Sequence, residues 1–272
     1  MKLSSKILIF IVLCLVAVST LYPLFFLAMT ALRTANDYTL SPFGWPKEWT
    51  LGNFMVLVEN YGVFDAVRNS LVVMAFGVTV SVSASVAAAF ALVKLNLPLK
   101  RVFSGGFVSV LLVPSQILVI PLYLLLARLG MVDTLLGVIV VYIGTTIPFG
   151  TFFMSVILRG VPDELIDAAK IDGAGHLRTL LLVVAPVART GILTLVVLTF
   201  LSMWNELLFG YILLPSESQQ LLTPRLAYIG GHFVSNEPVL MAALLTTALP
   251  PILILILMSR HLVNGVTDGA VR

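Results

Sequence analysis

Residues 159–189 read RGVPDELIDAAKIDGAGHLRTLLLVVAPVAR, and this polar segment separates two apolar stretches that are each long enough to cross a membrane. Four of the 13 acidic residues of the chain lie within it, namely Asp163, Glu164, Asp167 and Asp172. A connection between two membrane helices needs no structured polar loop of this length. The segment therefore favours a membrane protein that contacts another molecule outside the bilayer through this loop.

The composition of the whole chain also indicates a membrane protein. Of its 272 residues, 59% are hydrophobic and 11% are charged, whereas a soluble domain has about 25% charged residues. The net charge of +3 is too small and too scattered for nucleic-acid binding, and it suits basic anchors beside an anionic leaflet. The single cysteine, Cys14, excludes an intramolecular disulfide.

Six stretches reach the length of about 20 apolar residues that crosses a bilayer as a helix. They are residues 7–32, 69–93, 102–126, 135–158, 187–208 and 239–261. The first is much longer than the apolar core of a cleaved signal, which has about 7–15 residues, so we expect a retained helix. The sequence thus predicts an all-α, polytopic membrane protein with six transmembrane helices in a single domain, residues 1–272.

Within the second stretch, small residues recur at every fourth position, at Gly77, Ser81, Ser85 and Ala89. This spacing lets helix backbones approach closely. We expect this face to serve helix packing.

The distribution of Lys and Arg predicts the orientation, because cytoplasmic loops of membrane proteins are enriched in both. With the N-terminus inside, 11 of the 16 basic residues lie on the cytoplasmic side and 5 lie outside. We therefore expect both termini and residues 159–189 to be cytoplasmic. The outer segments are then residues 34–68 and 211–238, together with a tight turn near 130–134.

Several motifs of enzymes and of proton-driven carriers are missing from the sequence. It has no phosphate-binding GxxxxGK[ST] loop, no HExxH or GxSxG motif, and three histidines too far apart to share a metal ion. Proton-coupled carriers place ionisable groups along an intramembrane relay, whereas the nearest such group here, Glu206, lies near the end of a stretch. We expect no catalytic or metal site and an external energy source. A secondary carrier and a membrane scaffold are the alternatives.

The polar segment itself has the marks of a short helix. Pro162 suits a first helical turn, and Asp163 and Glu164 follow where negative charge meets the positive end of the helix dipole. Gly173 suits a left-handed helix end. A second helical stretch, residues 174–182, leads to Pro186 and the fifth apolar stretch.

Small side chains dominate one face of that first helix, which carries Leu165, Ala168, Ala169 and Asp172. Ala168 and Ala169 would let the helix sit in a shallow groove of a partner. The alternative is an amphipathic helix that lies in the membrane interface without a partner.

The same residues resemble the EAA loop of ABC-importer permeases, whose pattern is E-A-A, three residues, G, nine residues, I-x-L-P. The matching positions are Asp167, Ala168, Ala169, Gly173 and Pro186, and the departures are Asp167 for Glu, Val183 for Ile and Ala185 for Leu. Three further segments resemble the carbohydrate branch of these permeases, and within it the shorter, six-helix subunit of the maltose type. They are PSQILVIPLY at 114–123, WNELLFGYILL at 204–214 and NGVTDGAVR at 264–272.

The resemblance implies a type I ABC-importer permease fold and a set of partners. Such a permease forms a heterodimer with a second homologous permease, above two ATP-binding subunits that hold ATP and Mg²⁺, and receives sugar from an extracytoplasmic solute-binding protein. No cofactor is expected in this chain and no nucleic-acid partner. A non-sugar solute such as a phosphorylated polyol is the alternative. The residues implied to couple the permease to the ATPase are Asp163, Glu164, Asp167, Ala168, Ala169, Gly173 and Pro186.

Two further sites are expected at the outer side. Asn205 and Glu206 follow Trp204. In one interpretation they line or seal the outer mouth of the translocation path. In the other, Trp204 anchors the helix at the membrane interface and Asn205 and Glu206 are only solvated. Residues 211–238 match the loop that enters the cleft of the binding protein in the maltose-type relative. Gly230, Gly231 and Asn236 would give this long loop the flexibility to do so.

Overall fold

The computed structural model describes residues 3–232 and 236–270 of the chain. Within these ranges the chain is helical, and its only β-type pairing is an isolated bridge between Arg33 and Trp49. The chain divides into two compact units, which are described separately. One comprises Met1–Phe64 and Arg225–Pro250, and the other comprises Asp65–Pro224 and Pro251–Arg272.

The first unit begins with the long apolar helix α1. Its helices are α1 (Leu3–Ala31), α2 (Ala35–Leu40) and α3 (Gly52–Tyr61), with parts of α13 (Leu222–His232) and α14 (Glu237–Ala270). Thr34 caps α2, because its side chain accepts a hydrogen bond from the Asp37 N–H at 3.2 Å. Gly62 ends α3 in the left-handed conformation, with φ 54°.

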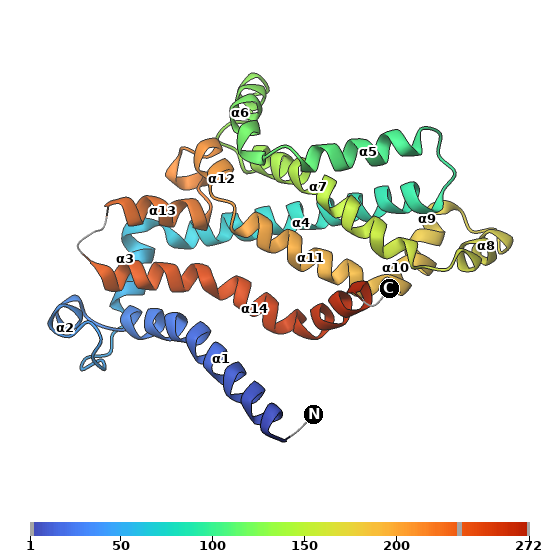
Figure 1. Ribbon diagram of the computed structural model, residues 1–272. Coiled ribbons are helices and arrows are strands. Elements are labelled where there is room, and N and C mark those ends of the chain that lie inside the picture. The colour runs from blue at the N-terminus through green and yellow to red at the C-terminus, as the bar shows by residue number, and fades with distance from the viewer. Residues whose placement is uncertain (1–2, 233–235, 271–272) are drawn as a thin grey trace. The chain divides into compact units, whose positions relative to one another are not determined.

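The second unit holds most of the remaining helices (Figure 1). They are α4 (Val63–Lys94), α5 (Lys100–Leu111), η1 (Ser115–Leu118), α6 (Val119–Arg128), α7 (Leu135–Arg159), α8 (Asp163–Ile171), α9 (His176–Thr179), η2 (Leu180–Val184), α10 (Ala185–Val187), α11 (Arg189–Trp204), α12 (Leu208–Leu213) and η3 (Glu217–Gln219). Both α5 and α11 pack against α7, and α12 packs against α6 and α7.

Small residues bring α4 and α7 close together, as the spacing in the second apolar stretch predicts. Ser81 and Ser85 are each 1% exposed. The Ser81 hydroxyl lies 2.5 Å from the Thr146 hydroxyl, and a Cβ added at Gly150 would collide with the Ser85 side chain. The packing face of α4 is therefore confirmed.

Within residues 3–232 and 236–270, the helices that are long and apolar enough to cross a membrane number four, or up to six if each of two bent pairs counts as one span. The all-helical membrane fold is confirmed. The third stretch, residues 102–126, is not one helix, because α5 and the η1–α6 segment meet at 92°. Pro114 lies in this break, lacks an N–H and disfavours a helical conformation in the residue before it.

The fifth stretch differs in its boundaries, because α11 ends at Trp204 and begins at Arg189 after a bend of 87°. A π-helical turn, η2, and Pro186 precede this bend; both are known causes of helix kinks. The last helix, α14, continues to Ala270, past the expected end of its stretch. The expectation of a single domain over the whole chain stays a prediction.

Candidate functional site

The short helix expected in the polar segment is present as α8, at the same end of the second unit as α9 and α10 (Figure 1). It begins after Pro162, whose φ of −60° and ψ of 136° place it just outside the helix. Asp163 and Glu164 occupy the first turn and are exposed. Their negative charge therefore lies at the positive end of the helix dipole.

The end of α8 is a Schellman motif, which satisfies the carbonyl groups of its last turn. The Gly173 N–H donates to the Lys170 carbonyl at 3.0 Å, and the Ala174 N–H donates to the Ala169 carbonyl at 2.9 Å. Gly173 has φ 75°, and a Cβ added there would meet no atom within 4 Å. Glycine is thus favoured at this position by backbone conformation alone.

The two alanines of the motif differ in exposure. Ala169 is 6% exposed and Ile166 is 3% exposed, so these two side chains pack against the chain itself. Ala168 and Asp167 are exposed. The helical rotation between neighbouring residues turns the Ala169 side chain inward. Contact of Ala168 and Ala169 with an ATPase stays a prediction.

An ion pair that the sequence reasoning missed fixes the start of α8. The Lys94 ammonium donates to Asp163 Oδ1 and to the Val161 carbonyl, each at 2.6 Å. The Lys94 side chain is 4% exposed, whereas that of Asp163 is 79% exposed. The hydrogen bond from Lys94 lowers the pKa of Asp163. The sequence did offer a signal for this pair. Lys94 lies at the end of the second apolar stretch and Asp163 at the start of the short helix, and both were expected on the same side of the membrane.

The segment after α8 forms an open, mostly apolar hollow of about 580 Å³. Its lining includes the exposed side chains of Leu177, Leu181 and Leu182. Pro186 lies beyond it in α10, at the start of the bend into α11. The hollow therefore belongs to the same end of the unit as α8.

Glu206 has a structural role at the opposite end of α11. Its carboxylate accepts backbone N–H donors from Leu208 at 2.9 Å, from Phe209 at 3.0 Å and from Gly210 at 3.3 Å. It also accepts the Tyr142 hydroxyl at 3.1 Å. The first N–H groups of a helix lack partners within that helix, and Glu206 supplies one for α12.

The residues just before Glu206 test one part of these interpretations, namely the role of Trp204 as an interface anchor. Asn205 is exposed, and its side chain donates to the Leu201 carbonyl at 2.9 Å. Trp204 is 3% exposed and stacks on Phe200 with ring centroids 5.4 Å apart. Trp204 is buried in the protein, so the interpretation of it as an interface anchor is wrong. A role of Asn205 and Glu206 in the outer mouth stays a prediction.

Residues 211–238 are not the unstructured loop that we expected. They hold the end of α12, then η3 and α13, and Gly230 and Gly231 lie inside α13. Pro224 is compatible with α13 because it falls in the first turn. Residues 233–235 lie outside the described residues, and Asn236 directly precedes α14. Contact of Gly230, Gly231 and Asn236 with a binding protein stays a prediction.

Side-chain hydrogen bonds hold the first part of this segment to the second unit. The Asn69 amide donates to the Ser218 carbonyl at 2.9 Å, and the Ser70 hydroxyl accepts the Leu222 N–H at 2.8 Å. The Asp133 carboxylate accepts the Ser216 N–H at 3.1 Å. Residues 216–222 are thus a fixed part of the unit. The described residues contain no group of three or more His, Cys, Asp or Glu side chains that could hold a metal ion.

Comparison with known proteins identifies relatives along nearly the whole chain. The model of the family described as binding-protein-dependent transport system inner membrane component matches residues 81–268. The inner membrane ABC transporter permease protein YcjP of Escherichia coli K12 is 31% identical, over 96% of this chain and 94% of its own length. The melibiose/raffinose/stachyose import permease protein MelC of Bacillus subtilis is 26% identical, over 95% and 94%.

The fold also matches a solved structure. A bacterial ABC transporter involved in the import of the acidic polysaccharide alginate has a chain with a TM-score of 0.80 and 21% identity, covering 96% of this chain and 98% of its own. At this identity the match establishes the fold, and it agrees with the helical membrane architecture above.

Proposed function

This chain belongs to the inner membrane components of binding-protein-dependent transport systems, and we propose that the solute it helps to import is a sugar or oligosaccharide. It is a multi-pass permease subunit of an ABC importer and not an enzyme. The similarity to MelC over nearly the full length of both chains supports a carbohydrate. A non-sugar solute such as a phosphorylated polyol is the second candidate.

Membership of this family implies that the chain works with an ATPase and a solute-binding protein. The composition of the complex is our proposal. We infer a heterodimer with a second homologous permease, two ATP-binding subunits that hold all of the ATP and Mg²⁺, and both termini of this chain in the cytoplasm. The excess of Lys and Arg on that side supports the orientation.

The geometry of α8 is the observation that carries the proposed coupling role. The helix is capped at its end, and its first residue is tied to the last residue of α4. Ile166 and Ala169 are buried, whereas Asp163, Glu164, Asp167 and Ala168 remain exposed for a partner. A push on the exposed face is then passed to α4 and the rest of the unit, which suits rigid-body alternating access.

A transport assay tests this function directly. The complete complex is reconstituted in liposomes with its binding protein, and uptake of labelled raffinose and of labelled glycerol phosphate is measured with and without ATP. We expect ATP-dependent uptake of the sugar only. Uptake of glycerol phosphate alone would establish the second candidate, and sugar uptake that needs no ATP would contradict the coupling role.

A further inference from the structure

Arg33 organises the chain just after α1. Its guanidinium donates to the Asp37 carboxylate at 3.0 Å and to the Ser41 carbonyl at 2.8 Å. It also donates to the carbonyls of Asp37, Pro42 and Gly44, at 3.0, 3.2 and 3.1 Å. These bonds use all five N–H donors of the guanidinium. Arg33 is 1% exposed, so it is a structural centre with no donor left for an anionic ligand.

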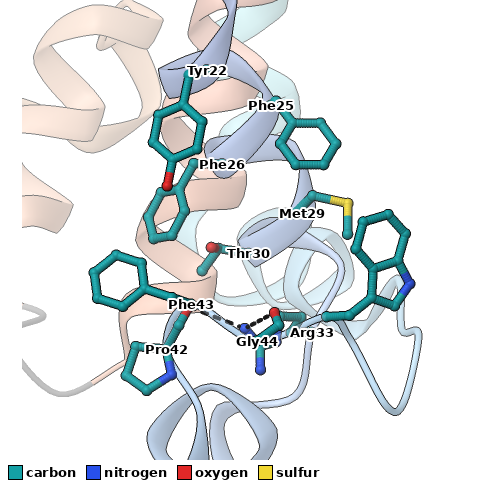
Figure 2. A pocket seen from close by; sticks show the side chains of 10 residues that line it. Tyr22, Phe25, Phe26, Met29, Thr30, Arg33, Pro42, Phe43 and Gly44 are labelled. Carbon is teal, nitrogen blue, oxygen red and sulfur yellow. Dashed lines mark hydrogen bonds between the residues drawn. The ribbon is translucent and has the colours of Figure 1, made fainter. Parts of the chain in front are cut away.

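The loop held by Arg33 folds back along α1. The Phe43 ring lies 5.8 Å from the Phe26 ring, and the Trp45 ring lies 6.3 Å from the Phe25 ring, between centroids. Figure 2 shows the α1 side chains above Arg33 and the loop around Phe43. Phe26 lies five residues before the end of α1, so the loop returns by about 7.5 Å along the helix axis.

The hollow between α1 and this loop does not suit a transported solute. Its volume is about 110 Å³, whereas small-molecule sites occupy roughly 300–1,000 Å³. The surface around it is nevertheless strongly aromatic and open. Phe43 is 84% exposed, Trp45 68% and Trp49 56%, and the Trp45 and Trp49 rings lie 6.4 Å apart.

The position of these rings along α1 matches a membrane boundary. The apolar run starts at Ile7, and about 20 helical residues, or roughly 30 Å, cross the hydrocarbon core. Counted from Ile7, that distance ends at Phe26, beside Phe43 and Trp45. The apolar side chains of α1 are exposed along the same run. The aromatic rings therefore continue a lipid-compatible surface at headgroup depth.

We propose that residues 42–49 and the end of α1 form a membrane-interface anchor that contacts the phospholipid headgroup layer. Trp and Tyr rings favour this layer. The anchor fixes the depth of α1 in the membrane. It also fixes the position of α3 relative to α1, because the amide of Asn53 in α3 donates to the carbonyls of Ala31 and Arg33 at 2.8 and 2.7 Å. The molecule that covers this aromatic surface is therefore phospholipid. The hydrogen bonds from Arg33 to the surrounding carbonyls keep the rings of Phe43 and Trp45 beside α1.

Fluorescence quenching by brominated phospholipids tests the anchor. The chain has three tryptophans, Trp45, Trp49 and the buried Trp204. The complete complex is reconstituted in lipids brominated near the headgroup or near the chain end, and the emission of Trp45→Phe, Trp49→Phe and Trp204→Phe variants is subtracted from that of the wild type. We expect brominated lipid to quench the emission of Trp45 and Trp49. Lipid brominated near the headgroup should quench it more strongly than lipid brominated near the chain end.

Two controls decide between lipid, water and protein contact. The Trp204 emission should be quenched less than that of Trp45 by either lipid. If Trp45 and Trp49 are quenched by aqueous iodide and not by brominated lipid, they face water and the proposal is wrong. If neither agent quenches them, a protein partner covers the surface and the proposal is equally wrong. Arg33→Lys, which cannot serve five acceptors, should reduce the lipid quenching in the assembled complex.

Discussion

The Lys94 ammonium lies 2.6 Å from the Asp163 carboxylate, and this ion pair joins the last residue of α4 to the first residue of α8. The same ammonium donates to the Val161 carbonyl, so the chain just before α8 is held as well. Movement of α8 and movement of the Lys94 end of α4 are thereby linked. In a permease that is driven through α8, this link is a route for the ATPase motion.

Removal of the Lys94 ammonium should therefore weaken coupling while the protein still inserts. We expect Lys94→Met to reduce sugar uptake per ATP hydrolysed, because both contacts that start α8 are lost. Asp163→Asn should be milder, since its side chain can still accept a hydrogen bond from Lys94. The measurement is the ratio of uptake to ATP hydrolysis in proteoliposomes, with Lys94→Arg as a variant that retains the charge. An unchanged ratio in Lys94→Met would exclude the link.

The same pair predicts a defined pH dependence. Lys94 lowers the pKa of Asp163 below the ordinary value of 3.8. A carboxyl whose folded pKa is lowered stabilises the fold above its unfolded pKa, and this contribution is lost as the pH falls through the folded pKa. The difference in Tm between the wild type and Asp163→Asn should thus be constant between about pH 5 and 8. A difference that changes within that window would assign the titration to another group.

Gly173 offers a test of the end of α8. Its φ of 75° disfavours any side chain, although nothing lies within 4 Å of an added Cβ. We expect Gly173→Ala to destabilise this turn by about 1–2 kcal/mol and to increase hydrogen exchange in α8. Gly175 is the matched control, because it also has open space but a φ of −69°. Equal exchange in Gly173→Ala and Gly175→Ala would contradict the left-handed conformation.

Ala168 and Ala169 should respond differently to the same bulky change. Ala168→Arg places its side chain on the exposed face, so we expect normal membrane levels with reduced co-purification of the ATPase and reduced uptake. Ala169→Arg forces a charge into a position that is 6% exposed, so we expect it to lower the amount of folded protein. Normal ATPase binding and uptake in Ala168→Arg would contradict the docking role of α8.

The sequence predicts features that depend on local chemistry and on apolar length. Pro162 and Gly173 predict the bounds of α8, and the serines of α4 predict a packing face. Contacts between distant segments leave no local pattern, which is why Lys94 with Asp163 and Tyr142 with Glu206 were missed. Similarly, Gly230 and Gly231 indicate a loop by composition, but both lie inside α13. The bonds from Asn69 and Ser70 that hold the start of α13 and the preceding turn join segments about 150 residues apart in the sequence.

The orientation of the chain can be tested by thiol labelling after Cys14 is replaced by alanine. We expect Lys47→Cys and Ser218→Cys to react with an impermeant maleimide in intact cells, and Arg178→Cys to react only after the membrane is opened. All three positions are exposed, so access to the reagent reports the side of the membrane. The 11-to-5 distribution of Lys and Arg is the physical basis for this expectation. Labelling of Arg178→Cys from outside would reverse the orientation, and α8 would then lie on the side opposite the ATPase.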